Sequence, residues 1–541
     1  NGNVSSLKDY KNQTTYFNYN QNNNVVSRDL VDGNISYQYN PMGRIVDVKK
    51  YLSDDQTVES EIVYEYDDGN RIYKEKTIAG LILPITTVRS NYDKNDNRIR
   101  MADTENVTTY YTYDELDRII EIKKGTKEHV YSYDAFDRVK LLSLPNGTSS
   151  ERTYNLDGQL VLLKNKKGAN IISQFEYSYD NIANSTEIIE NQTNIHTYTY
   201  DLKNQLTGAL HTLQPTETYS YDALGNRTSS AISNFYNYDV ADRLLEDAQY
   251  TYLFDDNGNM TSKTNKITLE VINYTYDSLN QLTRIDFQGG GYAEYKYDGY
   301  GRRILKNVGG VITKYIYDRE NIIEELDANN VVVAKYIHGV NIDEVLQMDR
   351  GGSLYYYHVD SLGSIRQISD STGTVVKGYT YDSFGNIVSE TGTLINPFTY
   401  TGRERDSESG LYYYRTRSYD PILGRFIQED SINYASLLIK PSNLSSYNPY
   451  LIKSIGLIIN DSNDLLKGVS KLIYYPQLLH NYVYVNNEPT KLTDPRGTWL
   501  RFVLLIGVGI LALTILALGI GRVLQRQNQL DQAMCRAGVE P

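Results

Sequence analysis

Three charged residues, Arg417, Asp430 and Asp494, form the set in this 541-residue sequence whose types could do chemistry together. Two carboxyl groups held close to each other cannot both ionise cheaply. One therefore keeps a proton and acts as an acid, while the other activates water or a carbonyl group. A neighbouring guanidinium can hold one of them charged and oriented. A purely structural interpretation stays open, because Asp494 begins the tetrapeptide Asp-Pro-Arg-Gly, which fits a type I turn.

Other catalytic and ligand-binding patterns are missing from the sequence. It contains no Walker loop and no HExxH, CxxC or GxSxG motif, and its six histidines are scattered. The sequence therefore predicts no metal site and no cofactor. Its single cysteine, Cys535, has no partner for an intrachain disulfide, so the fold must rest on packing and backbone hydrogen bonds.

Charge and aromatic composition narrow the class of protein. A formal net charge of −13 argues against nucleic acid as a partner, because binding phosphate requires a basic face. The 52 tyrosines far outnumber the 10 phenylalanines and the single tryptophan. Tyrosine suits pleated, half-wet surfaces on which the ring packs and the hydroxyl keeps a partner. The composition therefore favours extensive β-structure.

A tandem repeat, Tyr-x-Tyr-Asp, supplies the elements that must position the three charged residues. Residues two apart share one face of a strand, so each copy places two tyrosine rings side by side. The aspartate opens a turn whose fourth residue is Gly, Asn or Asp, the types that tolerate a left-handed backbone. Each unit is therefore predicted to be one hairpin of an antiparallel array. The eleven copies begin at Tyr64, Tyr111, Tyr131, Tyr177, Tyr198, Tyr219, Tyr236, Tyr274, Tyr295, Tyr315 and Tyr379.

This array resembles the Rhs/YD-repeat family, which includes bacterial polymorphic toxins, the C component of Tc toxins and the YD shell of teneurins. The resemblance covers roughly residues 16–400 and implies an all-β fold in which tandem hairpins coil into a hollow shell. A single hairpin is marginal in water, so the units must pair with their neighbours. Because the first residue is Asn1, we expect a missing N-terminal part of the shell, or a partner shell subunit, to complete it.

From Tyr355 onward the sequence is similar to the Rhs-associated core domain. The matching segments read YYYHVDSLGSIRQISDSTGTVV, FTYTGRERDSESGLYYYRTRSYDPILGRFIQED and NYVYVNNEPTKLTDPRG. We therefore expect a YD-repeat shell over residues 1–353 and the core domain over 354–498. An insertion at 434–480 separates the last two segments. Its apolar residues at helical spacing predict short amphipathic helices packed on the shell.

The resemblance also implies a reaction. In toxin members of the family, an Arg and two Asp at matching motif positions form an intramolecular aspartyl protease that cuts shortly after the Asp-Pro-x-Gly motif. It therefore implies that Arg417, Asp430 and Asp494 are catalytic here. The bond that this protease would cut is Thr498–Trp499.

The segment after that bond, residues 499–541, is too short for an ordinary enzymatic domain. It contains an uncharged apolar run, 502–521, which is long enough to cross a bilayer as a helix, or which fills the shell as a buried helix. The leading hypothesis is a toxin-like shell, secreted or at a cell surface, that encloses and releases this segment as a membrane-active cargo. The alternative is a structural or adhesive cell-surface protein that is anchored by the helix and is not cut.

Overall fold

The computed structural model describes residues 3–80, 82–430 and 482–495. They belong to one compact unit of the chain, and the residues of the second unit lie outside the described set. Three expectations from the sequence also fall outside it. They are the helical insertion at 434–480, the bond Thr498–Trp499 and the apolar helix at 502–521.

Two large antiparallel sheets carry the repeats, which confirms the predicted all-β fold of tandem hairpins. The first sheet runs from β1 (Ser6–Lys8) to β21 (Arg227–Ser230), and the second from β22 (Tyr236–Tyr238) to β37 (Ile387–Thr391). Within each sheet, strands that are consecutive in the chain are paired. The expected boundary between residues 353 and 354 lies inside β34 (Ser353–Val359), where this pairing continues.

The hairpin formed by β10 (Thr108–Tyr113) and β11 (Ile119–Lys124) shows how a repeat folds. The backbone N–H of Asp117 donates to the carbonyl of Asp114 (3.1 Å), and the Asp114 carboxylate accepts the backbone N–H of Arg118 (3.0 Å). Asp117 has a φ of 59°, and the pairing register shifts just before the turn. This is the predicted type I turn followed by a left-handed residue. The same left-handed conformation occurs at Asp137, Asn204, Gly225, Asp242, Asn280, Gly301 and Gly385.

A tyrosine hydroxyl fastens each hairpin to the one before it. The second tyrosine of a repeat donates its hydroxyl to the backbone carbonyl of the residue that begins the previous return strand, as Tyr133 does to Ile119 (2.6 Å). Phenylalanine cannot make this bond, which gives a reason for tyrosine at the second position of the repeat. The same bond is made by Tyr39, Tyr66, Tyr92, Tyr113, Tyr154, Tyr179, Tyr200, Tyr221, Tyr238, Tyr276, Tyr297, Tyr317 and Tyr381.

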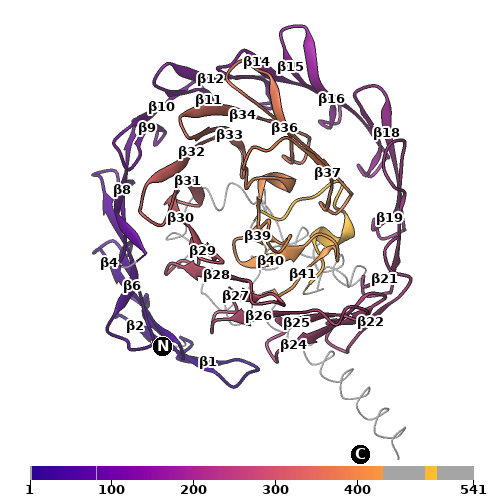
Figure 1. Cartoon of the computed structure of the whole chain (residues 1–541). Helices are drawn as coiled ribbons and strands as arrows, with labels where there is room; N and C mark the ends of the chain where they lie inside the picture. Colours follow the sequence, from indigo (N-terminus) through magenta and orange to yellow (C-terminus); the bar gives the residue numbers. More distant parts are fainter. Residues whose placement is uncertain (1–2, 81, 431–481, 496–541) are drawn as a thin grey trace, which may run out of the picture. The chain divides into compact units, whose positions relative to one another are not determined.

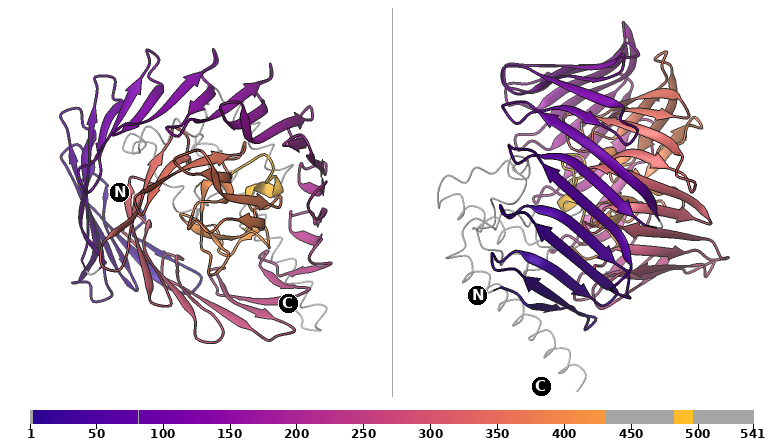
Figure 2. Two further views of the ribbon diagram at one scale, coloured as in Figure 1. Left: turned by 45° about the horizontal axis from the view of Figure 1, so that its top comes forward. Right: turned by 90° about the vertical axis from the view of Figure 1, so that its left-hand side faces the viewer.

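The two sheets follow one another as a curved band of strands, and the second packs against the first (Figures 1 and 2). Partly buried ion pairs join strands that are far apart in the sequence. Arg98 at the start of β9 (Arg98–Ala102) contacts Asp318 at 2.6 Å, and Arg366 contacts Glu190 at 2.7 Å. Side chains from both sheets share one hydrophobic core.

A third, smaller sheet lies inside the band (Figure 2). It consists of β38 (Glu404–Arg405), β39 (Tyr412–Tyr414), β40 (Arg417–Asp420) and β41 (Arg425–Phe426). This region departs from the hairpin rhythm, as its sequence indicates. Rings from it and from the segment after the insertion pack into an aromatic cluster, whose members are all buried. The aromatic cluster comprises Tyr400, Tyr412, Tyr414, Tyr419, Phe426 and Tyr484.

Candidate active site

Arg417, the first residue of β40, lies at the centre of the site. Its side chain is 2% exposed, and its guanidinium lies over the ring of Phe426, 3.6 Å from the ring centroid. A cation over an aromatic face is attracted to it, and a flat guanidinium is also fixed in orientation by the contact. Because Phe426 belongs to the neighbouring strand β41, the small sheet itself orients Arg417.

The structure brings the two predicted carboxylates together on this guanidinium. Nη2 of Arg417 is 3.3 Å from Oδ2 of Asp430 and 3.5 Å from Oδ2 of Asp494. Both aspartate side chains are almost fully buried. The two Oδ2 atoms therefore lie close to the same nitrogen atom of Arg417. Of the residues expected in the site, Thr498 and Trp499 lie outside the described residues.

The segment that carries Asp494 is anchored to the small sheet by its first residues. The backbone N–H of Phe426 donates to the carbonyl of Tyr482 (2.9 Å). Two residues later, Tyr484 enters the aromatic cluster, where its ring centroid is 4.5 Å from that of Tyr419. The chain thus returns to the same sheet on both sides of residues 431–481, and this return places Asp494 beside Arg417.

Aromatic side chains form one part of the surroundings of the site. Burial raises the pKa of Tyr484 well above its ordinary value, and neighbouring tyrosines and the charge of Asp494 act in the same direction. Burial likewise raises the pKa of Tyr414, whose hydroxyl donates to that of Tyr484 (3.1 Å). Both phenols therefore stay neutral near pH 7. Because Arg417, Asp430 and Asp494 are buried, their charges interact more strongly than they would in water.

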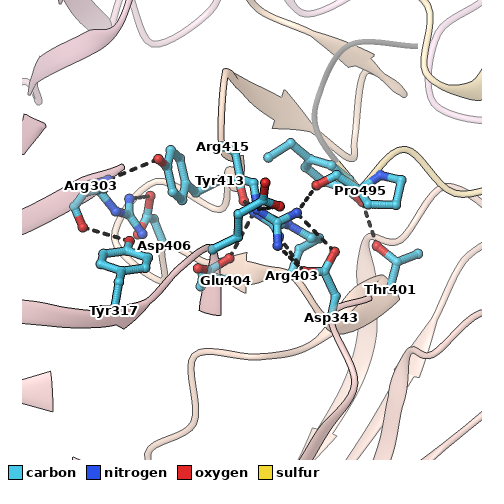
Figure 3. A network of polar contacts seen from close by, with 12 residues as sticks. Arg303, Tyr317, Asp343, Thr401, Arg403, Glu404, Asp406, Tyr413, Arg415 and Pro495 are labelled. Atoms are coloured by element: carbon cyan, nitrogen blue, oxygen red, sulfur yellow. Dashed lines mark hydrogen bonds and ion pairs between the residues drawn. The ribbon is translucent and has the colours of Figure 1, made fainter. Parts of the chain in front are cut away.

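A second polar network next to the site was missed by sequence reasoning (Figure 3). Asp343 accepts from Arg403 (2.9 Å) and from Arg415 (2.6 Å), and Arg415 also donates to the backbone carbonyl of Pro495. The pKa of Asp343 lies below its ordinary value: burial would raise it, and the charges of Arg403 and Arg415 more than offset that effect. Asp343 stands outside the recognised motifs. In the sequence, the one indication that a second guanidinium lies near the site is the segment Tyr-Arg-Thr-Arg, in which Arg415 stands two residues before Arg417.

The described residues contain neither a metal-binding cluster nor a membrane-spanning helix. Among the residues that the structure describes, no group of three or more His, Cys, Asp or Glu side chains could hold a metal ion. Within the same residues, no helix has the length and apolar character needed to cross a membrane. The apolar run 502–521 lies outside the described residues.

The repeat architecture and the central small sheet agree with a known family. The family model described as the teneurin YD-shell matches residues 182–455, which is half of the chain. This chain belongs to the YD-shell family. The match confirms the resemblance inferred from the Tyr-x-Tyr-Asp repeats, and it includes Arg417 and Asp430.

Known relatives of this YD-shell chain include bacterial proteins. It is 29% identical over 419 residues to the tRNA3(Ser)-specific nuclease WapA of Bacillus spizizenii, a match that covers 74% of this chain and 16% of that protein. It is 22% identical over 436 residues to double-stranded DNA deaminase toxin A of Burkholderia cenocepacia, covering 68% and 30%.

Among solved structures, the crystal structure of TcdB2-TccC3-Cdc42 resembles this YD shell with a TM-score of 0.65 at 16% identity. The match covers 90% of this chain and 27% of that one, and it shows a shared fold. The chain therefore spans less than a third of each of these proteins.

Proposed function

We propose that this chain forms the shell and core of a YD-shell toxin that cuts its own backbone at Thr498–Trp499 and so frees the segment 499–541. The names of its relatives, a tRNA nuclease and a DNA deaminase toxin, support the toxin class. Secretion or display at a cell surface would accompany such a function. The enclosed cargo would be the chain's own C-terminal segment.

The observation that carries this proposal is the convergence of Asp430 and Asp494 on one buried guanidinium nitrogen. With both carboxylates ionised, these three groups together carry one negative charge. If one of the two carboxyl groups carries a proton, the three groups together have no net charge. One proton shared between two carboxyl groups is the working state of an aspartyl protease.

The reaction would proceed by acid–base catalysis. The ionised carboxylate takes a proton from water as the water oxygen attacks the carbonyl carbon of Thr498, while the protonated carboxyl group gives its proton to the carbonyl oxygen. The resulting tetrahedral carbon then expels the nitrogen of Trp499, which receives the proton that the first carboxylate took from water. As the C=O bond forms again, the second carboxylate takes back a proton from the hydroxyl on the same carbon, so both carboxyl groups return to their starting states. The products are a carboxyl group on Thr498 and a free amine on Trp499.

Arg417 would act as an orienting residue in this scheme. Its guanidinium holds both Oδ2 atoms, and the contact with Phe426 fixes its own plane. Replacing Arg417 should therefore disturb the geometry of the pair rather than remove a reacting group.

The proposal also names partners. A further part of the shell, either preceding the chain or in a partner subunit, would close the enclosure around the cargo. The released segment would act on a membrane through the apolar run 502–521, since an uncharged run of this length suits a bilayer. Nucleic acid is not expected to bind the shell itself, because the net charge of −13 repels phosphate.

The mass of the denatured chain tests the proposal directly. Self-cutting predicts two species whose masses correspond to residues 1–498 and 499–541. A chain that stays whole after prolonged incubation, at every pH from 4 to 8, would instead favour the uncut structural or adhesive protein. The two species must form in purified protein at a rate independent of its concentration, as required of an intramolecular reaction.

A further inference from the structure

Two arginines at one tight turn, Arg415 and Arg417, contact two consecutive residues of another segment, Asp494 and Pro495. Arg415 and Thr416 connect β39 to β40, because Tyr414 pairs directly with Arg417 across the turn. Arg417 contacts the side chain of Asp494, and Arg415 donates to the backbone carbonyl of Pro495, the next residue. The first contact orients a proposed catalytic group. The second fixes the backbone immediately after it.

The backbone at Arg415 is itself unusual. Its φ is 59°, in the left-handed region that Gly, Asn and Asp enter more easily than other residues. Two-residue hairpin turns normally use those residue types. An arginine in this conformation is retained when its side chain makes bonds that a smaller residue could not. Here those bonds lead to Asp343 and Pro495.

Asp343 fixes the direction of the Arg415 guanidinium. Its Oδ1 accepts Nη2 of Arg415 at 2.6 Å, and its Oδ2 accepts Nη1 at 3.4 Å, so both carboxylate oxygens are engaged. Asp343 is in turn held by Arg403, which also donates through Nε and Nη2 to the carbonyl of Tyr413. The chain of contacts therefore runs from the small sheet through Asp343 and Arg415 to the Pro495 carbonyl.

We propose that Arg415, braced by Asp343, is a positioning residue for self-cutting: it holds the Pro495 carbonyl and so sets the path by which the backbone leaves Asp494 toward the bond that is cut. This inference rests on the proposed function. It assigns Arg415 no proton transfer, because its role ends at a backbone carbonyl three residues before Thr498. Its loss should slow cutting and loosen the choice of bond.

The variants Arg415→Ala, Arg415→Lys and Asp343→Asn test this role by the rate of cutting and the masses of the fragments. Arg415→Ala should slow cutting about 10- to 100-fold, as expected when a reacting group is misplaced by about an ångström. It should also yield fragments that end at more than one residue. Arg415→Lys should restore part of the rate and the single fragment mass, because a lysine still donates to a carbonyl.

Arg350→Ala serves as the matched control. The Arg350 side chain is 18% exposed, and that of Arg415 is 17% exposed. Like Arg415, Arg350 pairs with a buried carboxylate, that of Glu325. Among the described contacts, however, Arg350 has none with residues 482–495. This variant should cut at the wild-type rate and at the same bond. Thermal unfolding of all variants checks that a loss of rate is not a loss of fold.

Hydrogen exchange separates this inference from the proposed function. In an uncut Asp430→Asn background, Arg415→Ala should speed amide exchange in a peptide spanning 482–495, while Arg350→Ala should not. A wild-type chain that never cuts would defeat the proposed function. A wild-type chain that cuts, with Arg415→Ala folded, equally fast, equally specific and unchanged in exchange, would overturn the role of Arg415 alone.

Discussion

Asp430 and Asp494 lie on opposite sides of residues 431–481, yet their Oδ2 atoms contact the same nitrogen of Arg417, at 3.3 and 3.5 Å. One guanidinium thus gathers two carboxylates from separate parts of the chain. The two aspartates are far apart in the sequence, and they do not belong to one strand. Their meeting depends on the aromatic cluster, which holds Tyr484 and with it the segment that leads to Asp494.

Replacing either aspartate should stop self-cutting. Asp430→Asn and Asp494→Asn keep the size of the side chain and remove the group that carries or accepts the proton, so each should cut at least about 100-fold more slowly. Intact mass of the denatured chain gives the uncut fraction over time. Asp222→Asn, in a repeat turn, is the control and should cut normally. Equal cutting of wild type and both site variants would show that the aspartyl mechanism is wrong.

Arg417→Ala should slow cutting less than either aspartate change, because an orienting group can be lost without losing the reacting groups. Arg417→Lys should fall between Ala and wild type, since an ammonium keeps the charge but cannot hold two oxygens in the plane of one fork. The same mass measurement ranks the three rates. An Arg417→Ala chain as inactive as Asp494→Asn, with unchanged thermal unfolding, would give Arg417 a direct role in the reaction.

The hairpin repeats could be predicted from the sequence because their signals are local. Tyr-x-Tyr-Asp sets a period of two, and residues such as Asp117 and Asn204 mark the left-handed turn position. The bond from each second tyrosine to the preceding hairpin was not foreseen. Its acceptor, such as the carbonyl of Ile119 for Tyr133, is a backbone atom with no sequence signature.

The residues of the candidate site could be singled out in the sequence only where a motif marked them. Arg417, Asp430 and Asp494 stand in recognisable segments, and the structure brings all three together. Asp343 could not be found in this way, because its contact with Arg415 depends on how the second sheet packs around the small one. Long-range packing, rather than residue type, decides which carboxylate braces the turn.

Removing the hydroxyl of a repeat tyrosine should weaken the shell without changing its fold. Tyr133→Phe loses the bond to the Ile119 carbonyl and leaves that acceptor without this donor, which should lower the free energy of unfolding by about 1 kcal/mol. Urea unfolding followed by circular dichroism measures the change. Tyr110→Phe is the control, since Tyr110 is 52% exposed. If the two variants were equally stable, the hydroxyl of Tyr133 would not contribute to stability.

Two buried histidines should make the shell less stable in acid. Burial lowers the pKa of His129 and of His358 to about 4, below the ordinary value of 6.5. Above pH 6.5 both are neutral whether the chain is folded or unfolded. As the pH falls from 6.5 to 4, the unfolded chain takes up protons that the folded chain excludes, so stability is lost across this window. The loss is about 3 kcal/mol for each histidine and levels off below pH 4.

Thermal unfolding between pH 7 and pH 4 measures this dependence. The double variant His129→Asn, His358→Asn should be less stable than wild type at pH 7 but should lose less stability on acidification. Ser369→Ala removes the hydroxyl partner of His358 and keeps the titrating group, so it should retain the wild-type pH dependence. A double variant that follows the wild-type curve would mean that other groups set the acid sensitivity.

The final prediction concerns the segment 499–541, and it separates the toxin from the anchored surface protein. Twenty uncharged apolar residues, 502–521, would cause aggregation if exposed to water, so they must be enclosed by the shell or inserted in a bilayer. If the segment is a cargo, the intact chain should stay unbound in liposome flotation, and the peptide 499–541 should float with the vesicles and release trapped dye.

If the chain is instead an anchored surface protein, the opposite results are expected. The intact chain should float with the vesicles, and the peptide should insert without causing leakage. A peptide in which Leu511 and Leu513 are both replaced by Lys is the matched control, because two charges in the middle of the run oppose insertion and should abolish binding. An intact chain that stays unbound, together with a wild-type peptide that never causes leakage, would leave the shell intact but refute a membrane-active cargo.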